Sequence, residues 1–260
     1  MTRHEDEAIV LEVQERGESD RRVLMMVRSG ELVPALAPAG ARSRQRFGGA
    51  LQPGARVRAR WTVRREGAEP VLEEAQLLAA PPAGDPLERL YLAAHVLETI
   101  GAFAREGAVD PPLYRLLAAA LDEIARGAPV DALARYVEAW TLRLAGLLPE
   151  GSACAECGAP LAGRRVALAA ERGVFCSRHI PAGARVLGPG AAGWLEATRR
   201  AGPEALPELA AAHAVELARV LVDLVVSFTG KPLRAWPALA RLRGGGWTED
   251  EPVPGGGGAS

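Results

Sequence analysis

The sequence predicts a multidomain β + α fold, in which a small five-stranded barrel is followed by an all-α domain. Short apolar runs separated by turn residues occupy the first 80 positions, and segments with apolar residues at helical spacing occupy most of the rest. With 260 residues, 48% of them hydrophobic, the chain is long enough for about two domains and apolar enough to give each one a core.

Five short strands are expected near the N-terminus. They are residues 8–13, 23–27, 32–37, 57–63 and 70–78, with a polar turn at 16–20 between the first two. The fourth alternates strictly, which sends Val57, Ala59, Trp61 and Val63 inward and Arg58, Arg60 and Arg64 outward. Five strands in about 80 residues are typical of a small closed barrel, so we predict an OB-fold over residues 1–80.

Helices are expected after residues 81–84, Pro-Pro-Ala-Gly, which suit neither a strand nor a helix interior and mark a boundary. Asp85 and Pro86 then provide an N-cap and a first-turn proline. The predicted helices are one from 85 through 97, then 110–127, 130–148 and 207–228. They define a helical domain over 85–243, and the Gly- and acid-rich residues 244–260 predict a disordered tail.

A Cys-x-x-Cys pair and a Cys-x-x-His pair interrupt the predicted helices. Cys154, Cys157, Cys176 and His179 lie within 26 residues and include every cysteine of the chain. Three thiolates and one imidazole at this spacing are typical of a tetrahedral zinc site, so we predict a zinc knuckle at 151–180. Four protein ligands leave no position for water, which favours structural zinc. The alternative is free thiols or a Cys154–Cys157 redox pair, which usually has a βαβ context that the predicted elements lack.

The net charge of −1 conceals an uneven distribution of charge. No Asp or Glu occurs from Leu32 through Arg65, whereas eight arginines do. On one barrel face, beside the loop at 40–48, these arginines would form a positive groove for a phosphate backbone. Phe47 is either a platform for base stacking or part of the barrel core. The expected DNA-binding residues are Arg42, Arg44, Arg46, Phe47, Arg56, Arg58, Arg60, Arg64 and Arg65.

Motifs for catalysis, secretion and membrane insertion are missing from the sequence. It contains no phosphate-binding or dinucleotide-binding glycine loop and no His-Glu-x-x-His helix, so we do not expect an enzyme. It has no apolar run long enough to span a membrane, and its acidic first residues are unlike a signal peptide. We therefore expect a soluble cytoplasmic protein with no membrane partner.

The order of these pieces resembles the RecO family of DNA repair proteins. The resemblance rests on the first strand at 7–11, the turn 18–20, the Gly40-Ala41-Arg42 element with Arg44 and Phe47, the helical domain with its knuckle, and residues 230–233, Gly-Lys-Pro-Leu. It extends to about Trp236. One departure is His179, where many zinc-bearing relatives have cysteine. Because some relatives lack the zinc site altogether, zinc is not expected to take part in the activity.

The resemblance implies binding to single- and double-stranded DNA and annealing of complementary strands. It also implies a role with RecR and RecF in loading RecA onto DNA coated by single-stranded-DNA-binding protein, and hence an association with the nucleoid. The C-terminal tail of that coating protein is a further expected partner. Two alternatives stay open: a zinc-containing interaction scaffold whose arginine patch docks an acidic partner, and a nucleic-acid enzyme with one zinc position free.

Overall fold

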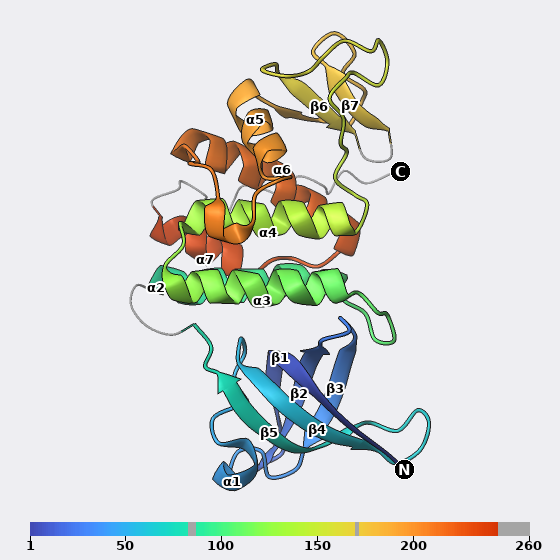
Figure 1. Cartoon of the computed structure of the whole chain (residues 1–260), viewed down its shortest axis with the longest axis vertical. Coiled ribbons are helices and arrows are strands. Elements are labelled where there is room, and N and C mark those ends of the chain that lie inside the picture. Colours follow the sequence, from blue (N-terminus) through green and yellow to red (C-terminus); the bar gives the residue numbers. More distant parts are fainter. Residues whose placement is uncertain (83–86, 170–171, 244–260) are drawn as a thin grey trace. The chain divides into compact units, whose positions relative to one another are not determined.

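The computed structural model describes residues 1–82, 87–169 and 172–243 (Figure 1). Within it the chain forms two compact units, Met1–Arg126 and Gly127–Ser260, which are treated separately below. Three predictions fall outside the described residues: the Ala-Gly half of the boundary at 83–84, the helix cap formed by Asp85 and Pro86, and the tail at 244–260.

A closed five-stranded barrel begins the first unit, and it confirms the predicted OB-fold. Its strands are β1 (Thr2–Arg16), β2 (Asp20–Val27), β3 (Leu32–Ala37), β4 (Arg56–Val63) and β5 (Val71–Ala79). They close in the order β1-β2-β3-β5-β4, and β3 and β5 form a parallel pair through Leu36 and Val71. β1 is longer than predicted because its polar first half, residues 2–9, pairs with β4.

The barrel core contains the inward side chains that the alternation in β4 predicts. Val57, Ala59 and Trp61 are buried there, and Val63 packs against them. Thr62 departs from the alternation, since it is also buried and its hydroxyl donates a hydrogen bond to Glu73 at 2.6 Å. The pattern of apolar residues therefore identifies the core, while Thr62 shows that the outward side of β4 is partly covered by β5.

Three helices accompany the barrel in the first unit. They are the short α1 (Arg44–Phe47), α2 (Leu87–Phe103) and α3 (Pro111–Arg126). The predicted stripe of α3 is buried at Leu113, Leu117 and Leu121. α2 and α3 pack against each other, and α2 also contacts β1.

The second unit combines helices with a small sheet. Its helices are α4 (Val130–Leu144), α5 (Pro189–Ala197), the 3-10 helix η1 (Pro203–Ala205), α6 (Ala211–Thr229) and α7 (Ala235–Leu242). α4 packs against α6. The Arg135 guanidinium of α4 also lies 4.0 Å from the ring centre of Trp236 in α7, and this contact joins α7 to α4. α6 begins later than predicted because residues up to Ala210 are extended, and the carbonyl of Pro207 accepts a hydrogen bond from Trp194 at 3.0 Å.

A three-stranded sheet not predicted from the sequence lies between α4 and α5 along the chain. Its strands are β6 (Val166–Ala169), β7 (Gly173–Cys176) and β8 (Arg185–Leu187), in the order β7-β6-β8. It forms part of the predicted knuckle segment, because Cys176 is the last residue of β7. Of the helices that the structure describes, none combines the length and the apolarity needed to cross a membrane.

Candidate metal centre and nucleic-acid interface

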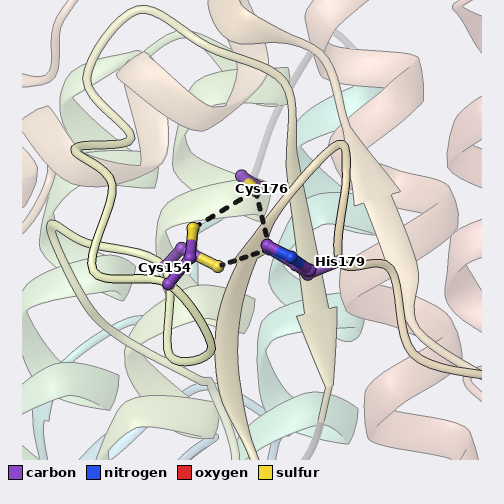
Figure 2. A group of neighbouring side chains, drawn as sticks. Cys154, Cys176 and His179 are labelled. Carbon is purple, nitrogen blue, oxygen red and sulfur yellow. Dashed lines mark hydrogen bonds between the residues drawn. The ribbon is translucent and has the colours of Figure 1, made fainter.

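The four predicted zinc ligands lie together in the second unit. The Nδ1 atom of His179 is 3.4 Å from Sγ of Cys176 and 3.8 Å from Sγ of Cys154 (Figure 2). Sγ of Cys157 is 4.0 Å from Sγ of Cys176, and all four ligand atoms lie within 4.8 Å of one another. The fold therefore brings two sequence pairs that are 18 residues apart into one cluster.

These separations match a tetrahedral metal site. Zinc bonds of about 2.3 Å to sulfur and about 2.0 Å to nitrogen, at tetrahedral angles, place neighbouring ligand atoms about 3.5 to 3.8 Å apart. Three of the measured distances lie at or close to this range. The cluster therefore fits a zinc ion in size and in ligand chemistry.

Local backbone hydrogen bonds position each pair of ligands. In the first knuckle the amide of Cys154 donates to the carbonyl of Ala159 at 2.9 Å, and Gly158 returns a bond to the carbonyl of Cys154 at 2.9 Å. Gly158 has a φ of +68°, which a residue with a Cβ rarely adopts. In the second knuckle the backbone amide of His179 donates to the carbonyl of Cys176 at 3.0 Å. Each knuckle is thus a tight turn that aims its two side chains at one point.

The electrostatics favour the thiolate, the form of cysteine that binds metals, at Cys154 and Cys176, whereas at Cys157 a hydrogen bond from the backbone of Ala159 acts against burial, which raises the pKa of that thiol. Burial raises the pKa of the Cys154 thiol, but hydrogen bonding by the backbone of Cys176, Cys157 and Glu156 outweighs it and lowers that pKa to about 6. A hydrogen bond from the backbone of Arg178 is the main cause that lowers the pKa of Cys176. Because all four ligands are protein side chains, the arrangement suits a closed structural site rather than a hydrolytic one.

Five of the predicted DNA-binding arginines, all in the barrel part of the sequence, have exposed side chains. Within residues 1–82, 87–169 and 172–243, none of the five forms an ion pair. They are Arg42, Arg44, Arg58, Arg64 and Arg65. Exposed guanidinium groups without a carboxylate partner are the groups available to a phosphate.

Three other predicted arginines have partners within the protein. Arg46 donates to the carbonyl of Pro38 at 2.6 Å and to the hydroxyl of Ser43 at 3.1 Å. Arg56 forms an ion pair with Asp122 at 3.0 Å. Arg60 forms ion pairs with Glu73 and Glu74.

The outward face of β4 is a mixed-charge surface, which corrects the expected continuous positive groove. Glu5 of β1 pairs in register with Arg60, and Glu7 with Arg58. On the other side of β4, Glu74 of β5 also pairs with Arg60. The acid-free stretch of sequence concealed these carboxylates because they come from strands that become neighbours only in the barrel.

Phe47 belongs to the barrel core, where it has 2% of its surface exposed. Of the two roles that the sequence left open, stacking on a base is therefore corrected, since a base cannot reach a ring enclosed in the barrel. The side chain instead fastens α1 to the barrel, because Phe47 is the buried residue of that helix.

A cavity of about 360 Å³ lies in the second unit beside the sheet that carries Cys176. Its apolar lining includes Leu148, Leu161, Val174 and Leu195, and its charged lining includes Arg143, Glu150, Glu196 and Arg199. Arg143 is almost fully buried and donates to the carbonyl of Leu195 at 2.6 Å. Arg199 is more exposed and pairs with Glu150 at 3.2 Å. Sequence patterns did not indicate this cavity, because its walls come from separate short elements.

Comparisons with known proteins agree with both units. The family model for the N-terminal part of recombination protein O matches residues 1–81, and the model for its C-terminal part matches residues 85–237. A DNA repair protein RecO of Anaeromyxobacter sp. (strain K) is 36% identical over 200 residues, which cover 74% of this chain and 76% of the relative. Another, from Koribacter versatilis, is 31% identical over 174 residues, 66% of this chain and 71% of the relative. The chain therefore belongs to the RecO family, which acts in DNA repair and recombination.

Proposed function

We propose that the protein binds single- and double-stranded DNA and anneals complementary single strands. With RecR and RecF, it helps to load RecA onto single-stranded DNA coated by single-stranded-DNA-binding protein. The proposal rests on the match of both RecO family models, and the exposed arginines without ion partners in the OB-fold part support it. Binding of this kind holds the protein at the nucleoid in the cytoplasm.

The proposed annealing needs charge neutralisation rather than a catalytic residue. Two DNA strands repel each other through their phosphates, and guanidinium groups that displace counterions reduce that repulsion. Base pairing then supplies the free energy, so the reaction needs no ATP. Arg42 and Arg44 are the strongest candidates for these contacts, because they lie two residues apart at the start of α1 and are both exposed.

The proposed division of labour follows the predicted domains. Residues 1–80 form the DNA-binding domain, and residues 85–243 form the helical domain that meets protein partners. The knuckle at 151–180 holds one structural zinc ion through Cys154, Cys157, Cys176 and His179. Zinc would supply a closed cross-link between the two knuckles, and no step of annealing uses it.

We propose the cavity of the second unit as the site for the C-terminal tail of single-stranded-DNA-binding protein. An apolar floor with Arg199 at its edge suits a segment that carries both acidic and apolar side chains. Arg199 has 39% of its side chain exposed, whereas its partner Glu150 competes for the same guanidinium. Glu150→Gln should therefore strengthen binding of a labelled tail peptide, and Arg199→Ala should weaken it. Unchanged binding of the tail peptide by both variants would exclude the cavity.

The decisive experiment measures annealing of complementary labelled oligonucleotides coated with single-stranded-DNA-binding protein, without ATP, at several salt concentrations. The variant is Arg42→Ala with Arg44→Ala. The matched control is Arg16→Ala with Arg22→Ala, which removes two barrel arginines that already pair with Glu69 at 2.8 and 3.3 Å. Each lost phosphate contact should flatten the plot of log affinity against log salt by about 0.7 for single strands.

The expected result is faster annealing by the wild type and the control, and a salt slope smaller by about 1.4 in the Arg42/Arg44 variant. If that variant keeps the wild-type slope, the loop of α1 is not the DNA site. If the wild type neither accelerates annealing nor retains DNA at low salt, the exposed arginines dock an acidic protein partner instead. A further variant, Glu73→Gln with Glu74→Gln, should release Arg60 and steepen the slope.

A further inference from the structure

His4 and Trp61 form an aromatic stack near the N-terminal end of β1. The two residues pair in register between β1 and β4, and their side chains lie on the same side of the sheet. Their ring centres are 5.3 Å apart and the ring planes differ by 11°, so the imidazole lies nearly parallel to the indole. The pairing of the two strands thus places one ring over the other.

The two rings differ in their exposure to solvent. Trp61 has 7% of its surface exposed and belongs to the barrel core, whereas His4 is exposed. Across the described ranges, the His4 side chain takes part in no hydrogen bond or ion pair, and its one ring contact is with Trp61. The accessible surface of the stack is therefore an imidazole that is supported from below by a fixed indole.

Two arginines follow the strand that carries Trp61. Arg3, next to His4 in β1, lies on the opposite side of the strand, where it pairs in register with Thr62 and forms an ion pair with Glu73 at 3.8 Å. On β4, Val63 pairs with Thr2, and the exposed Arg64 and Arg65 follow it directly. An aromatic face bordered by guanidinium groups is the combination that binds single-stranded nucleic acid, because a base stacks on the ring while its phosphates meet the cations.

We propose that His4, supported by Trp61, stacks on an unpaired nucleobase of a single strand whose phosphates lie on Arg64 and Arg65. This inference rests on the proposed DNA binding and names a base contact within it. Every base has a π face, so the contact should not depend on base identity. A base inside a duplex is already stacked on its neighbours, so His4 should contribute to single-strand binding and not to duplex binding.

The surroundings of His4 favour a nucleobase over a protein side chain as the ligand. Protein anchors usually enter apolar pockets, whereas the exposed surface here is one polar ring, and two exposed arginines follow the strand that supports it. An apolar protein segment on this surface would make few contacts and would desolvate the arginines. A nucleotide of a single strand can stack its base on the imidazole and place its phosphates against the arginines.

The test uses the full-length chain and two oligonucleotides of equal length, oligothymidine and the same strand with abasic central positions. Both strands carry the same phosphates, so their affinity ratio measures base contacts alone. The wild type should prefer oligothymidine by roughly tenfold. His4→Ala and His4→Leu should bring the ratio close to one, while His4→Phe should retain it. Thr2→Ala, two residues away on the same strand, is the matched control and should resemble the wild type.

His4→Leu keeps an apolar cover over Trp61 and removes only the π face, so it separates stacking from barrel stability. Thermal midpoints of all variants show whether the barrel is intact. Duplex affinity and the salt slope should not change in any His4 variant, because no phosphate contact is lost. If His4→Leu folds and keeps the wild-type ratio, the stacking proposal is overturned while DNA binding stands. If the wild type binds neither strand at low salt, the DNA-binding function fails, and the stacking contact fails with it.

Discussion

Arg56 on β4 forms an ion pair with Asp122 on α3, with 3.0 Å between guanidinium nitrogen and carboxylate oxygen. The same guanidinium donates to the carbonyl of Ala118 at 3.3 Å and lies 3.8 Å from the carboxylate of Glu7. The side chain is therefore committed to joining the barrel to α3 within the first unit. Arg56 acts as a structural residue, even though it lies in the run of arginines that suggested DNA binding.

Replacing Arg56 should affect stability more than DNA affinity. The side chains of Arg56 and Asp122 are 24% and 43% exposed, so solvent screens the pair and Arg56→Ala should cost about 1 kcal/mol. Arg58→Ala, which removes an exposed neighbour without an ion pair, should cost almost nothing. Urea denaturation of both variants, and a double-mutant cycle with Asp122→Ala, measure the difference. A coupling energy near zero in that cycle would contradict the assigned pair.

Tyr114 should make the first unit sensitive to alkaline pH. Burial is the main cause that raises the pKa of Tyr114, and its hydroxyl also donates to the carboxylate of Glu7 at 2.9 Å. The folded state therefore favours the neutral phenol. The contribution of the neutral Tyr114 phenol to stability is complete below the ordinary tyrosine pKa of about 10 and is lost as pH rises above that value.

Urea denaturation between about pH 8 and pH 11 tests this dependence. The wild type should lose stability through the upper part of that range, and Tyr114→Phe should lose less. Tyr91→Phe is the matched control, since it removes a tyrosine hydroxyl of α2 that forms no hydrogen bond within the described residues. An equal loss in all three proteins would show that Tyr114 is not its source.

Gly30 should tolerate no side chain. Its φ is +86°, and a Cβ atom there would lie 2.7 Å from the backbone nitrogen of Asp110 and even closer to the carbonyl of that residue. Gly30→Ala should therefore destabilise the first unit by about 3 kcal/mol or more, since both backbone strain and steric overlap oppose it. Gly17→Ala is the matched control. Gly17 has a φ of +64° but no atom near the added methyl group, so about 1 kcal/mol is expected. Equal losses in the two variants would contradict the close approach to Asp110.

Removal of the metal should destabilise the second unit and leave DNA binding intact. A ligand present at a thousandfold excess over its dissociation constant stabilises the folded state by about 4 kcal/mol. Chelation, or His179→Ala, should lower the thermal midpoint and release one zinc ion per chain. His179→Cys supplies a fourth thiolate and should retain the ion. Unchanged stability after complete zinc loss would refute a structural site.

Local sequence signals predicted most of the elements. β3 has the predicted bounds, and the four metal ligands came from the spacing of two short pairs, because each knuckle is formed by residues close together in the chain. Partners between strands could not be predicted in the same way. Glu74 lies next to Arg60 because β5 pairs with β4 in one particular register, and no local pattern in either strand reveals that register.

Short elements gave too little pattern to be recognised. β8 has three residues and α1 has four, which is little more than one period of the apolar pattern and too little for a reliable prediction. Phe47 shows the consequence, since its place in the sequence suits a surface loop as well as a core. The fold decides between these roles only when α1 closes against the barrel.

The burial of Phe47 has a consequence for the entropy of DNA binding. A flexible arginine loop loses conformational freedom when it grips a ligand, and that loss subtracts from the affinity. Here Phe47 is fixed in the barrel, and Arg46 bonds to Pro38 and Ser43, so the backbone between Arg42 and Arg44 is ordered before any DNA arrives. The loop is preorganised: folding of the barrel has already restricted its backbone, and binding restricts only the two arginine side chains.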